Sequence, residues 1–322
     1  MTKQKKCFVG IDTSNYTTSL AIISESSELV ANLKCPLRVR DGERGLRQSD
    51  AVFSHTVNIP SIIDIARPYL YNKKVACIGV SEKPRNENGS YMPCFLVGIS
   101  VAEAISAFLD VPLYRFSHQC GHIMAGIYSS SRFDLLSRPF GAFHVSGGTT
   151  ELVRTEYVDG ALVTQIVADT RDLNAGQVID RIGVYLGLKF PAGTQLEELA
   201  VRNKKNIPKK KISIKDGKIN LSGLENMAIK LYKDSGDAEL TAAFVFEYIG
   251  RALVEMRKYY ESIYGSSDFL YAGGVLCNSI IKKILDRQGE DAFAKPEMSS
   301  DNAVGVACLA MLRQNNGVYN GY

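Results

Sequence analysis

Residues 7–23 read CFVGIDTSNYTTSLAII, and this stretch sets the fold class. Its periodicity predicts an apolar strand, a short polar turn and a second, alternating strand. Residues 143–153 read FHVSGGTTELV and repeat that plan, with a small polar turn, a Thr-Thr pair, one further residue and then Leu. A repeat ~130 residues downstream predicts two lobes that are built on one plan.

Helical patterns follow each strand-rich half of the chain. Apolar residues recur at helical spacing over 50–70, where Pro60 falls inside or at the start of the helix, and also over 97–109 and 242–260. A strand over 269–272 runs into a Gly-Gly turn and then a helix, an arrangement that favours a nucleotide phosphate at the turn. The alternation of strands and helices predicts an α/β fold.

Length and composition narrow the class of protein. The chain has 322 residues, 45% of them hydrophobic, which is enough for two domains with substantial cores. No apolar run approaches the roughly 20 residues of a membrane span and no signal sequence precedes the first strand, so we expect a cytoplasmic protein without a membrane partner. Seven scattered cysteines without a CxxC pair argue against a disulfide framework and a zinc ribbon.

One segment, residues 201–220, differs from the rest in charge. The whole chain carries a formal net charge of only +4, which does not by itself predict nucleic-acid binding. The segment is rich in lysine and contains a single acid, Asp216. Two interpretations stay open, a solvated basic loop and a contact with RNA phosphates. The candidate residues for an RNA contact are Lys204, Lys205, Lys209, Lys210 and Lys211.

The second polar turn has the composition of an anion-binding site. Gly147 and Gly148 let the backbone approach a ligand closely, and Ser146 with the neighbouring amides can cradle a phosphate. An ordinary glycine-containing hairpin is the alternative for either turn taken alone. The presence of two similar turns favours phosphate binding.

The histidines predict a metal site. His118 and His122 are one helical turn apart, so in a helix both imidazoles project from one face and their nitrogens can meet on a metal ion. Because two ligands are too few for a tight site, we take Asp301, at the start of the last apolar helix, as the candidate third ligand. Its alternative role is a helix N-cap. A zinc peptidase of the HExxH type is disfavoured, because Gln119 stands where that motif needs Glu.

These motifs resemble, in order and over most of the chain, those of the tRNA threonylcarbamoyladenosine transferase family, formerly labelled glycoproteases. Residues 118–122, HQCGH, are similar to its His-x-x-Gly-His metal motif, and residues 144–150, HVSGGTT, to its Val-Ser-Gly-Gly phosphate loop. Further stretches that resemble family motifs are 174–181, 186–193, 221–224, 273–278 and 300–302.

The resemblance implies a two-lobed α/β fold of the actin, Hsp70 and hexokinase type (the ASKHA fold), formed from a duplicated mixed-sheet unit. We expect an N-terminal lobe over 1–116, which the C-terminal helix could complete. The C-terminal lobe would span 117–322 and carry most of the metal and nucleotide motifs.

The resemblance also implies an activity and its ligands. Such enzymes move a threonylcarbamoyl group from threonylcarbamoyl-adenylate to an adenosine beside the tRNA anticodon. They use one divalent metal, iron or zinc, with ATP or the adenylate as ligand. The implied metal ligands are His118, His122 and Asp301. The implied nucleotide or substrate residues are His144, Val145, Ser146, Gly147, Gly148, Asp180, Gly193 and Asn278. No side chain stands out as a nucleophile, so we expect positioning and electrostatic stabilisation instead of a covalent enzyme intermediate.

Several positions depart from the family pattern. The chain has NYTT at 15–18 where the family has Cys-Asp-Glu-Thr, a different loop over 81–93, Gln119-Cys120 for Met-Glu, and Asp172-Leu173 for a double Asp. These departures leave two alternatives open. One is a divergent paralogue that carbamoylates another acceptor or hydrolyses nucleotide, and the other is a non-catalytic subunit that pairs with a paralogue or a second copy.

Overall fold

The computed structural model describes residues 4–14, 16–38, 46–87, 89–287, 289–300 and 302–315. The chain divides into two compact units. Unit 1 comprises Met1–Arg138, Glu156–Thr164 and Ser300–Tyr322, and unit 2 comprises Pro139–Thr155 and Gln165–Ser299. Residues 117–138, which the sequence analysis places in the second lobe, therefore lie in unit 1, and the C-terminal helix lies there too.

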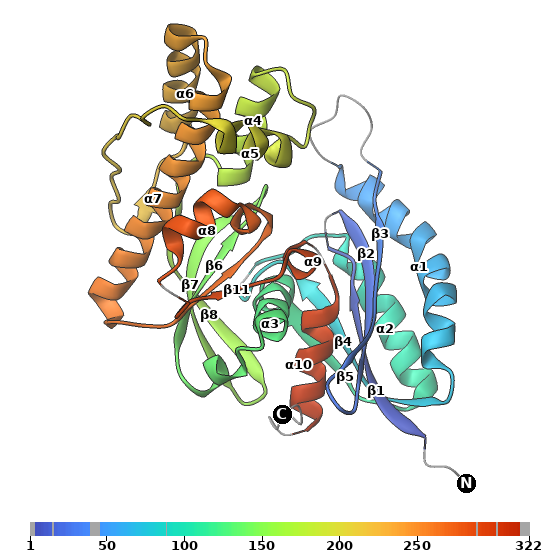
Figure 1. The fold of residues 1–322 in the computed structure, drawn as a ribbon. Coiled ribbons are helices and arrows are strands. Elements are labelled where there is room, and N and C mark those ends of the chain that lie inside the picture. Colours follow the sequence, from blue (N-terminus) through green and yellow to red (C-terminus); the bar gives the residue numbers. More distant parts are fainter. Residues whose placement is uncertain are drawn as a thin grey trace. The chain divides into compact units, whose positions relative to one another are not determined.

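Unit 1 contains a five-stranded sheet in the order β3-β2-β1-β4-β5 (Figure 1). Strand β1 pairs antiparallel with β2 and parallel with β4, and β4 pairs parallel with β5. The strands are β1 (Lys5–Asp12), β2 (Thr17–Ser24), β3 (Leu29–Pro36), β4 (Lys73–Lys83) and β5 (Leu113–Ser117). The helices are α1 (Gln48–Leu70), α2 (Phe95–Leu109), α3 (His118–Ser130), the 3₁₀ turn η1 (Phe133–Ser137) and α10 (Val304–Gln314).

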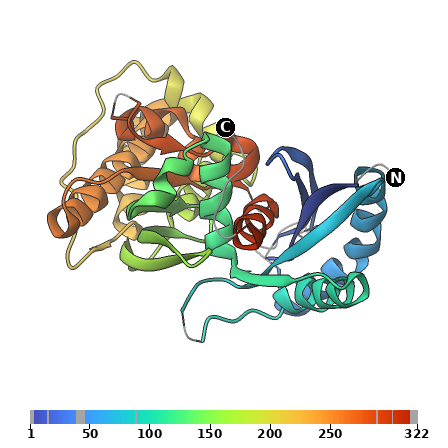
Figure 2. The ribbon, with the colours of Figure 1, turned by 90° about the horizontal axis from the view of Figure 1, so that it is seen from below.

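Different helices cover the two faces of this sheet (Figures 1 and 2). Alternate residues of β1, such as Ile11, face the core that α1 and α2 form with the sheet. Gly10 and Gly79, which pair in register across β1 and β4, face α10. A methyl group on Gly10 would overlap the backbone of Ala303, and one on Gly79 would overlap that of Val306. The two glycines therefore let α10 lie directly on the sheet.

Helix α3 crosses α10 where two glycines meet. A methyl group on Gly305 of α10 would overlap the carbonyl group of Gly121 in α3. The Ser117 side chain caps α3 by accepting a hydrogen bond from the Cys120 amide at 3.2 Å, so the helix begins at His118, directly after β5. The first turn of α3 is thus fixed by β5 at one end and by α10 along its side.

Unit 2 contains a six-stranded sheet in the order β11-β10-β6-β7-β8-β9. Strand β6 pairs antiparallel with β7 and parallel with β10, and β10 pairs parallel with β11. The strands are β6 (Phe140–Val145), β7 (Thr150–Val158), β8 (Ala161–Thr170), β9 (Lys218–Ile219), β10 (Phe269–Ala272) and β11 (Ala292–Phe293). Without β9, the order β8-β7-β6-β10-β11 repeats that of unit 1, which confirms the predicted duplication of a mixed sheet.

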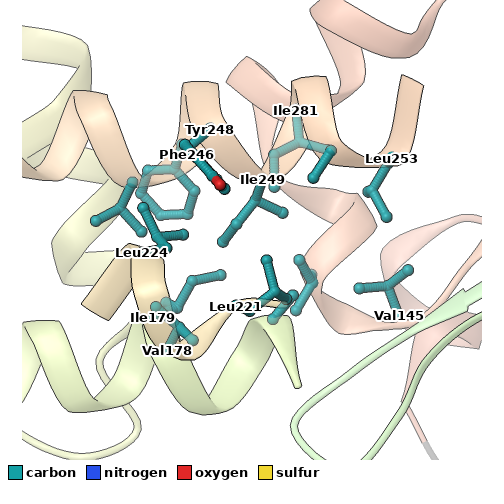
Figure 3. Close-up of a cluster of buried hydrophobic side chains, with 14 of the residues drawn as sticks. Val145, Val178, Ile179, Leu221, Leu224, Phe246, Tyr248, Ile249, Leu253 and Ile281 are labelled. Atoms are coloured by element: carbon teal, nitrogen blue, oxygen red, sulfur yellow. The ribbon is translucent and has the colours of Figure 1, made fainter. Parts of the chain in front are cut away.

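Unit 2 differs from unit 1 by a segment inserted between β8 and α7, which adds α4, α5, β9 and α6. The helices are α4 (Ala175–Tyr185), α5 (Gly193–Arg202), α6 (Ser222–Ser235), α7 (Ala238–Tyr264), α8 (Ser279–Leu285) and α9 (Pro296–Ser299), with the 3₁₀ turn η2 (Gly274–Cys277). Figure 3 shows the core where Val178 and Ile179 of α4 meet Leu224 of α6 and Phe246 and Ile249 of α7.

The helices predicted over 50–70, 97–109 and 242–260 are confirmed as α1, α2 and α7, with Pro60 inside α1. Residues 203–217, in the lysine-rich stretch, form a segment with neither helix nor strand in which most residues are exposed. Within the described ranges, no helix combines the length and the apolar character needed to cross a membrane.

We predict that Gly305→Ala destabilises the protein by about 1–3 kcal/mol, because the added methyl group forces α3 and α10 apart. Gly223→Ala in α6 is the matched control, since its methyl group would meet no atom within 4 Å and alanine favours a helix over glycine. Thermal unfolding followed by circular dichroism compares the two. An unchanged melting temperature in Gly305→Ala would show that the helices separate freely.

Candidate functional site

A buried carboxylate lies at the carboxyl end of β1 in unit 1. Oδ1 of Asp12 accepts a hydrogen bond from the Ser14 amide at 2.7 Å. Oδ2 accepts from the Ser81 hydroxyl, at the end of β4, and contacts His118 Nδ1 at 2.8 Å. Burial acts to raise the pKa of Asp12, but its electrostatic interaction with His118 and these hydrogen bonds hold that pKa below its usual range. Asp12 is therefore an anion at neutral pH.

The anionic Asp12 determines which nitrogen of His118 carries the proton. Because Nδ1 faces a carboxylate that can only accept, we assign the proton to Nδ1, and the lone pair is then on Nε2. That Nε2 lies 2.9 Å from Nε2 of His122, and the two ring centroids are 4.3 Å apart. The predicted i, i+4 pair is therefore helical and its nitrogens converge. Both can reach one cation at the usual Zn–N distance of about 2.0–2.1 Å.

The predicted third ligand, Asp301, lies outside the described residues. In the described part of the chain, no group of three His, Cys, Asp or Glu side chains is arranged to hold a metal ion. Helix α10 begins at Val304, and its Gly305 packs against Gly121, the residue just before His122. The first turn of α10 therefore packs against the histidine-bearing turn of α3.

Two of the three residues between the histidines, Gln119 and Cys120, connect α3 to other segments of unit 1. The backbone amide of Gln119 donates to the Pro84 carbonyl at 3.0 Å, and Pro84 lies in the loop that departs from the family pattern. The Cys120 thiol accepts from Asn86 of the same loop at 3.2 Å and donates to the Leu162 carbonyl at 3.3 Å. Burial raises the pKa of Cys120 to about 11, so it remains a neutral thiol and a poor metal ligand at neutral pH.

The turn after β1 contains a buried hydroxyl without a partner. Thr13 fixes one side of the turn by donating to the Cys94 carbonyl at 2.9 Å and accepting from the Gly98 amide at 3.0 Å. Ser14 Oγ, in contrast, is buried and makes no hydrogen bond to any residue that the structure describes. A buried hydroxyl left unpaired costs about 1–3 kcal/mol, and a polar ligand at this turn would remove that penalty.

The turn after β6 in unit 2 exposes backbone donors. The Ser146 amide donates to the Thr149 carbonyl at 2.8 Å, and the Gly148 amide donates to Ser146 Oγ at 3.3 Å. The amides of Gly147 and Thr149 make no hydrogen bond within the described ranges. A methyl group on Gly147 or Gly148 would meet no atom within 4 Å. The turn therefore combines free amides with open space, as an anion site requires.

Helix α4 starts against this turn. The Gly176 amide donates to the Ser146 carbonyl at 3.2 Å, and a methyl group on Gly176 would lie 2.7 Å from the Cα atom of Gly147. The Ala175 amide donates to Thr150 Oγ1 at 2.8 Å. The start of α4 and the glycine turn are thus held as one rigid piece.

Two further predicted residues, Asp180 and Gly193, lie close to each other in unit 2. Asp180 Oδ1, on α4, accepts from the Ala192 amide at 2.8 Å, and Gly193 is the next residue and the first of α5. Burial raises the pKa of Asp180, and the hydrogen bond from Ala192 opposes that effect. Oδ2 of Asp180 has no partner among the described residues, which leaves it available as an acceptor.

The side-chain amide group of Asn278 is buried, and only its oxygen has hydrogen-bond partners among the described residues. Its Oδ1 caps α8 by accepting from the amides of Ile280 at 3.1 Å and Ile281 at 3.0 Å. Its Nδ2 is buried and has no hydrogen-bond partner in the described chain. Glu197 of α5 accepts from the neighbouring Ser279 amide at 2.8 Å, which fixes α5, and with it Gly193, to this turn.

The remaining predicted residues are placed by the strands and by the lysine-rich segment. His144 of β6 lies opposite Glu151 of β7, with Nδ1 and Oε1 3.7 Å apart. Val145 contacts the turn after β10, where Gly273 has φ 110° and no room for a side chain. The predicted lysines lie on the exposed segment of residues 203–217, where Lys205 pairs with Asp237 at 2.6 Å.

Asp12, Ser81 and Glu197 were not among the site residues predicted from the sequence. Each is separated from its partner by a long stretch of sequence, 106 residues in the case of Asp12 and His118. One signal was available for Asp12, because a charged residue ends an otherwise apolar strand and must be buried with partners. Nothing in the sequence identified those partners.

The sequence matches a family model over most of its length and curated relatives over nearly all of it. The family model for tRNA N6-adenosine threonylcarbamoyltransferase (TsaD) matches residues 44–308. A protein of that name from Moorella thermoacetica is 28% identical over 320 residues, which cover 94% of this chain and 90% of the relative.

Solved structures with this architecture share little sequence. HypF of T. kodakarensis has a TM-score of 0.65 at 14% identity, over 98% of this chain and 49% of HypF. Component A of the (R)-2-hydroxyglutaryl-CoA dehydratase of Acidaminococcus fermentans has a TM-score of 0.55 at 15% identity, over 96% and 99% of the two chains. With the duplicated sheet order, these likenesses confirm the actin-, Hsp70- and hexokinase-like fold.

We predict that Asp12→Asn weakens Zn²⁺ or Fe²⁺ binding by about 10- to 100-fold, because the amide no longer fixes the proton on His118 Nδ1. Isothermal titration with the metal measures the affinity, and ¹⁵N spectra of the imidazoles report the tautomer. Ser81→Ala is the control, since it removes a hydrogen bond to Asp12 but leaves its charge. Equal metal affinity in Asp12→Asn and the parent protein would contradict this role.

We predict that Gly147→Ala lowers the affinity for an adenine nucleotide about tenfold or more, because the methyl group would fill space that a phosphate bound at this turn requires. The melting temperature should not change, since that methyl group meets no protein atom within 4 Å. Fluorescence titration with a nucleotide analogue, together with thermal unfolding, separates the two effects. A variant that binds nucleotide as the parent does would exclude the turn as the phosphate site.

Proposed function

Because the chain belongs to the tRNA N6-adenosine threonylcarbamoyltransferase family, a family of transferases, we propose that it transfers a threonylcarbamoyl group from threonylcarbamoyl-adenylate to an adenosine of tRNA. The observation that carries the proposal is the His118–His122 pair, whose Nε2 atoms lie 2.9 Å apart in the motif where the family places its metal. The turns of unit 2 supply the complementary features of a nucleotide site.

The proposed reaction is an acyl transfer that balances without an oxidant or reductant. The exocyclic N6 of the adenosine attacks the carbamoyl carbon of the donor. A new C–N bond forms, the C–O bond to the adenylate phosphate breaks, and AMP leaves. N6 loses one proton to solvent or to the leaving phosphate. The products are the modified adenosine and AMP.

We assign donor binding to unit 2. The free amides of Gly147 and Thr149 would donate to the phosphate, which is the usual role of such a backbone nest. The open Oδ2 of Asp180 would accept from ribose hydroxyls, and the unpaired Nδ2 of Asn278 would donate to the nucleoside. Each assignment satisfies a polar group that has no partner among the described residues.

We assign metal binding to His118 and His122, with Asp301 as the proposed third ligand. The pair suits zinc or ferrous iron, because both ions accept imidazole nitrogens as ligands and Asp12 favours the tautomer that has its lone pair on Nε2. A bound divalent ion would supply positive charge that neutralises phosphate and polarises the carbonyl group. The role of Asp12 is to hold His118 in the ligating tautomer, and that of Ser81 and Ser14 is to hold Asp12.

The proposal requires no nucleophile from the protein. Cys120, the cysteine nearest to the histidines in sequence, has its pKa raised to about 11 and is held by hydrogen bonds to Asn86 and Leu162. Rate enhancement would therefore come from positioning the two substrates and from preorganised charge. We place the reaction in the cytoplasm, where tRNA and the adenylate are available.

We expect the purified protein, with Zn²⁺ or Fe²⁺, to convert threonylcarbamoyl-adenylate and tRNA into AMP and threonylcarbamoyl-modified adenosine. His118→Ala should lower the rate at least about a hundredfold, because the charge that stabilises the transition state is lost. Lys230→Ala, on the exposed surface of α6, is the control and should keep the parent rate. Nucleoside analysis of the tRNA by mass spectrometry, with AMP release, gives the readout.

The same assay separates the alternatives. AMP release without modified adenosine would indicate a divergent enzyme that uses water or another acceptor. Neither product, together with a His118→Ala variant that still supports the growth of a strain dependent on this protein, would indicate a non-catalytic subunit. Either outcome would overturn the proposed transfer to tRNA.

A further inference from the structure

A lysine strap crosses the outside of unit 2 between α5 and β9. We define it as residues 203–217, which are drawn in yellow in Figures 1 and 2. The strap contains one acidic residue, Asp216, and the following lysines: Lys204, Lys205, Lys209, Lys210, Lys211 and Lys215. The nucleotide and metal assignments use none of these residues.

The strap has a fixed backbone although it contains no helix or strand. Ile207, Ile212 and Ile214 are half-buried and pack against the hydrophobic core of unit 2. Arg171 Nη2 donates to the Lys215 carbonyl at 3.4 Å, and the Asp169 amide donates to the Gly217 carbonyl at 3.0 Å. These contacts anchor the strap on both sides of its three consecutive lysines, at Ile207 and again over residues 212–217.

The three consecutive lysines of the strap face solvent. Lys209, Lys210 and Lys211 are all exposed, whereas the nearest isoleucines on either side of them, Ile207 and Ile212, are half-buried. These residues therefore place three positive charges next to one another at the surface.

Most of this charge is not neutralised by the protein. Lys205 pairs with Asp237 at 2.6 Å. Lys204, Lys209, Lys210 and Lys211 have no carboxylate within ion-pair distance among the residues that the structure describes. Four uncompensated cations in one segment are a local positive field on a chain whose formal net charge is only +4.

We propose that the lysine strap binds the phosphate backbone of RNA, which deepens and rests on the proposed transfer to tRNA. The chemistry of the strap selects this ligand over other polyanions. Lysines are point charges suited to phosphates, and the strap carries no aromatic residue to stack on bases, so the contact is independent of sequence.

Two other anionic surfaces fit less well. A membrane surface would need exposed apolar side chains to insert, but the isoleucines of the strap are turned into the core of unit 2. An acidic protein would need an apolar centre for its interface, and Lys209, Lys210 and Lys211 offer only charge. The phosphates of an RNA strand need neither apolar side chains that insert nor an apolar centre of the interface.

The test uses the full chain and a triple variant, Lys209→Gln, Lys210→Gln and Lys211→Gln. Fluorescence anisotropy measures the Kd for an unmodified tRNA transcript over a series of salt concentrations. Loss of three phosphate contacts should reduce the magnitude of the slope of log K against log salt by about 2–3, since each contact contributes roughly 0.7–0.9. Affinity at low salt should fall for tRNAs of different sequence alike.

A matched control changes the same charge elsewhere on unit 2. Lys230→Gln, Lys233→Gln and Lys283→Gln replace three exposed lysines on α6 and α8. This control should keep the slope and affinity of the parent protein. Equal slopes for the strap variant and the parent, or equal losses in the strap and control variants, would overturn the proposal. So would a strap variant that loses binding to poly-glutamate or anionic vesicles but keeps tRNA.

Failure of the strap and failure of the proposed function give different results. Binding is measured without donor or metal, so a strap-dependent salt slope supports the proposal even in a protein that modifies no tRNA. Conversely, the parent protein could modify tRNA while the strap variant has an unchanged salt slope and an unchanged KM for tRNA. That outcome would support the proposed function and exclude the strap as an RNA contact. Adenine-nucleotide affinity should be the same in all three proteins, which verifies that each is folded.

Discussion

The buried carboxylate of Asp12 is the constraint on which the candidate metal site depends. An ion in the interior is tolerated only when hydrogen bonds and opposite charge replace water. Here the replacement comes from the ends of three neighbouring segments, with Ser14 after β1, Ser81 in β4 and His118 after β5. The same contacts that stabilise the anion therefore align three parallel strand ends and orient an imidazole. In unit 1 the contacts that stabilise the carboxyl ends of the strands are therefore also the contacts that orient the His118 imidazole.

Duplication supplied the same scaffold twice, and the two copies present opposite chemistry at equivalent turns. In unit 1 the strand ends in an acceptor, Asp12, whose Oδ2 contacts His118 Nδ1. In unit 2 the corresponding strand ends at Val145 and the turn presents amide donors from Gly147 and Thr149, which suit an anion. Hairpins of identical topology thus offer a carboxylate acceptor in one unit and backbone donors in the other, which suits them to the proposed cation and the proposed anion respectively.

The repeat, the helices and the histidine pair were predictable because each is written in local spacing. His118 and His122 needed only the helical period, and the duplication needed only the Thr-Thr turns. What could not be predicted depends on contacts between distant segments. The lobe boundary predicted after residue 116 assigned α3 to the second lobe, whereas α3 lies in unit 1. No sequence pattern shows that Gly121 of α3 meets Gly305 of α10. Asp12 and Glu197 were missed for the same reason, since their partners are far along the chain.

The glycines distinguish what the fold requires from what a ligand requires. Gly10, Gly79 and Gly305 have no room for a methyl group, so packing of α10 accounts for them completely. Gly147 and Gly148 have open space around the missing side chain and negative or extended φ, so neither packing nor backbone strain explains them. Neither glycine is required by the fold, and the amides of this turn are open to solvent. A phosphate that binds at the turn, as proposed, would explain both glycines. The second turn therefore suits the proposed phosphate, whereas the first is determined by the charge that it buries.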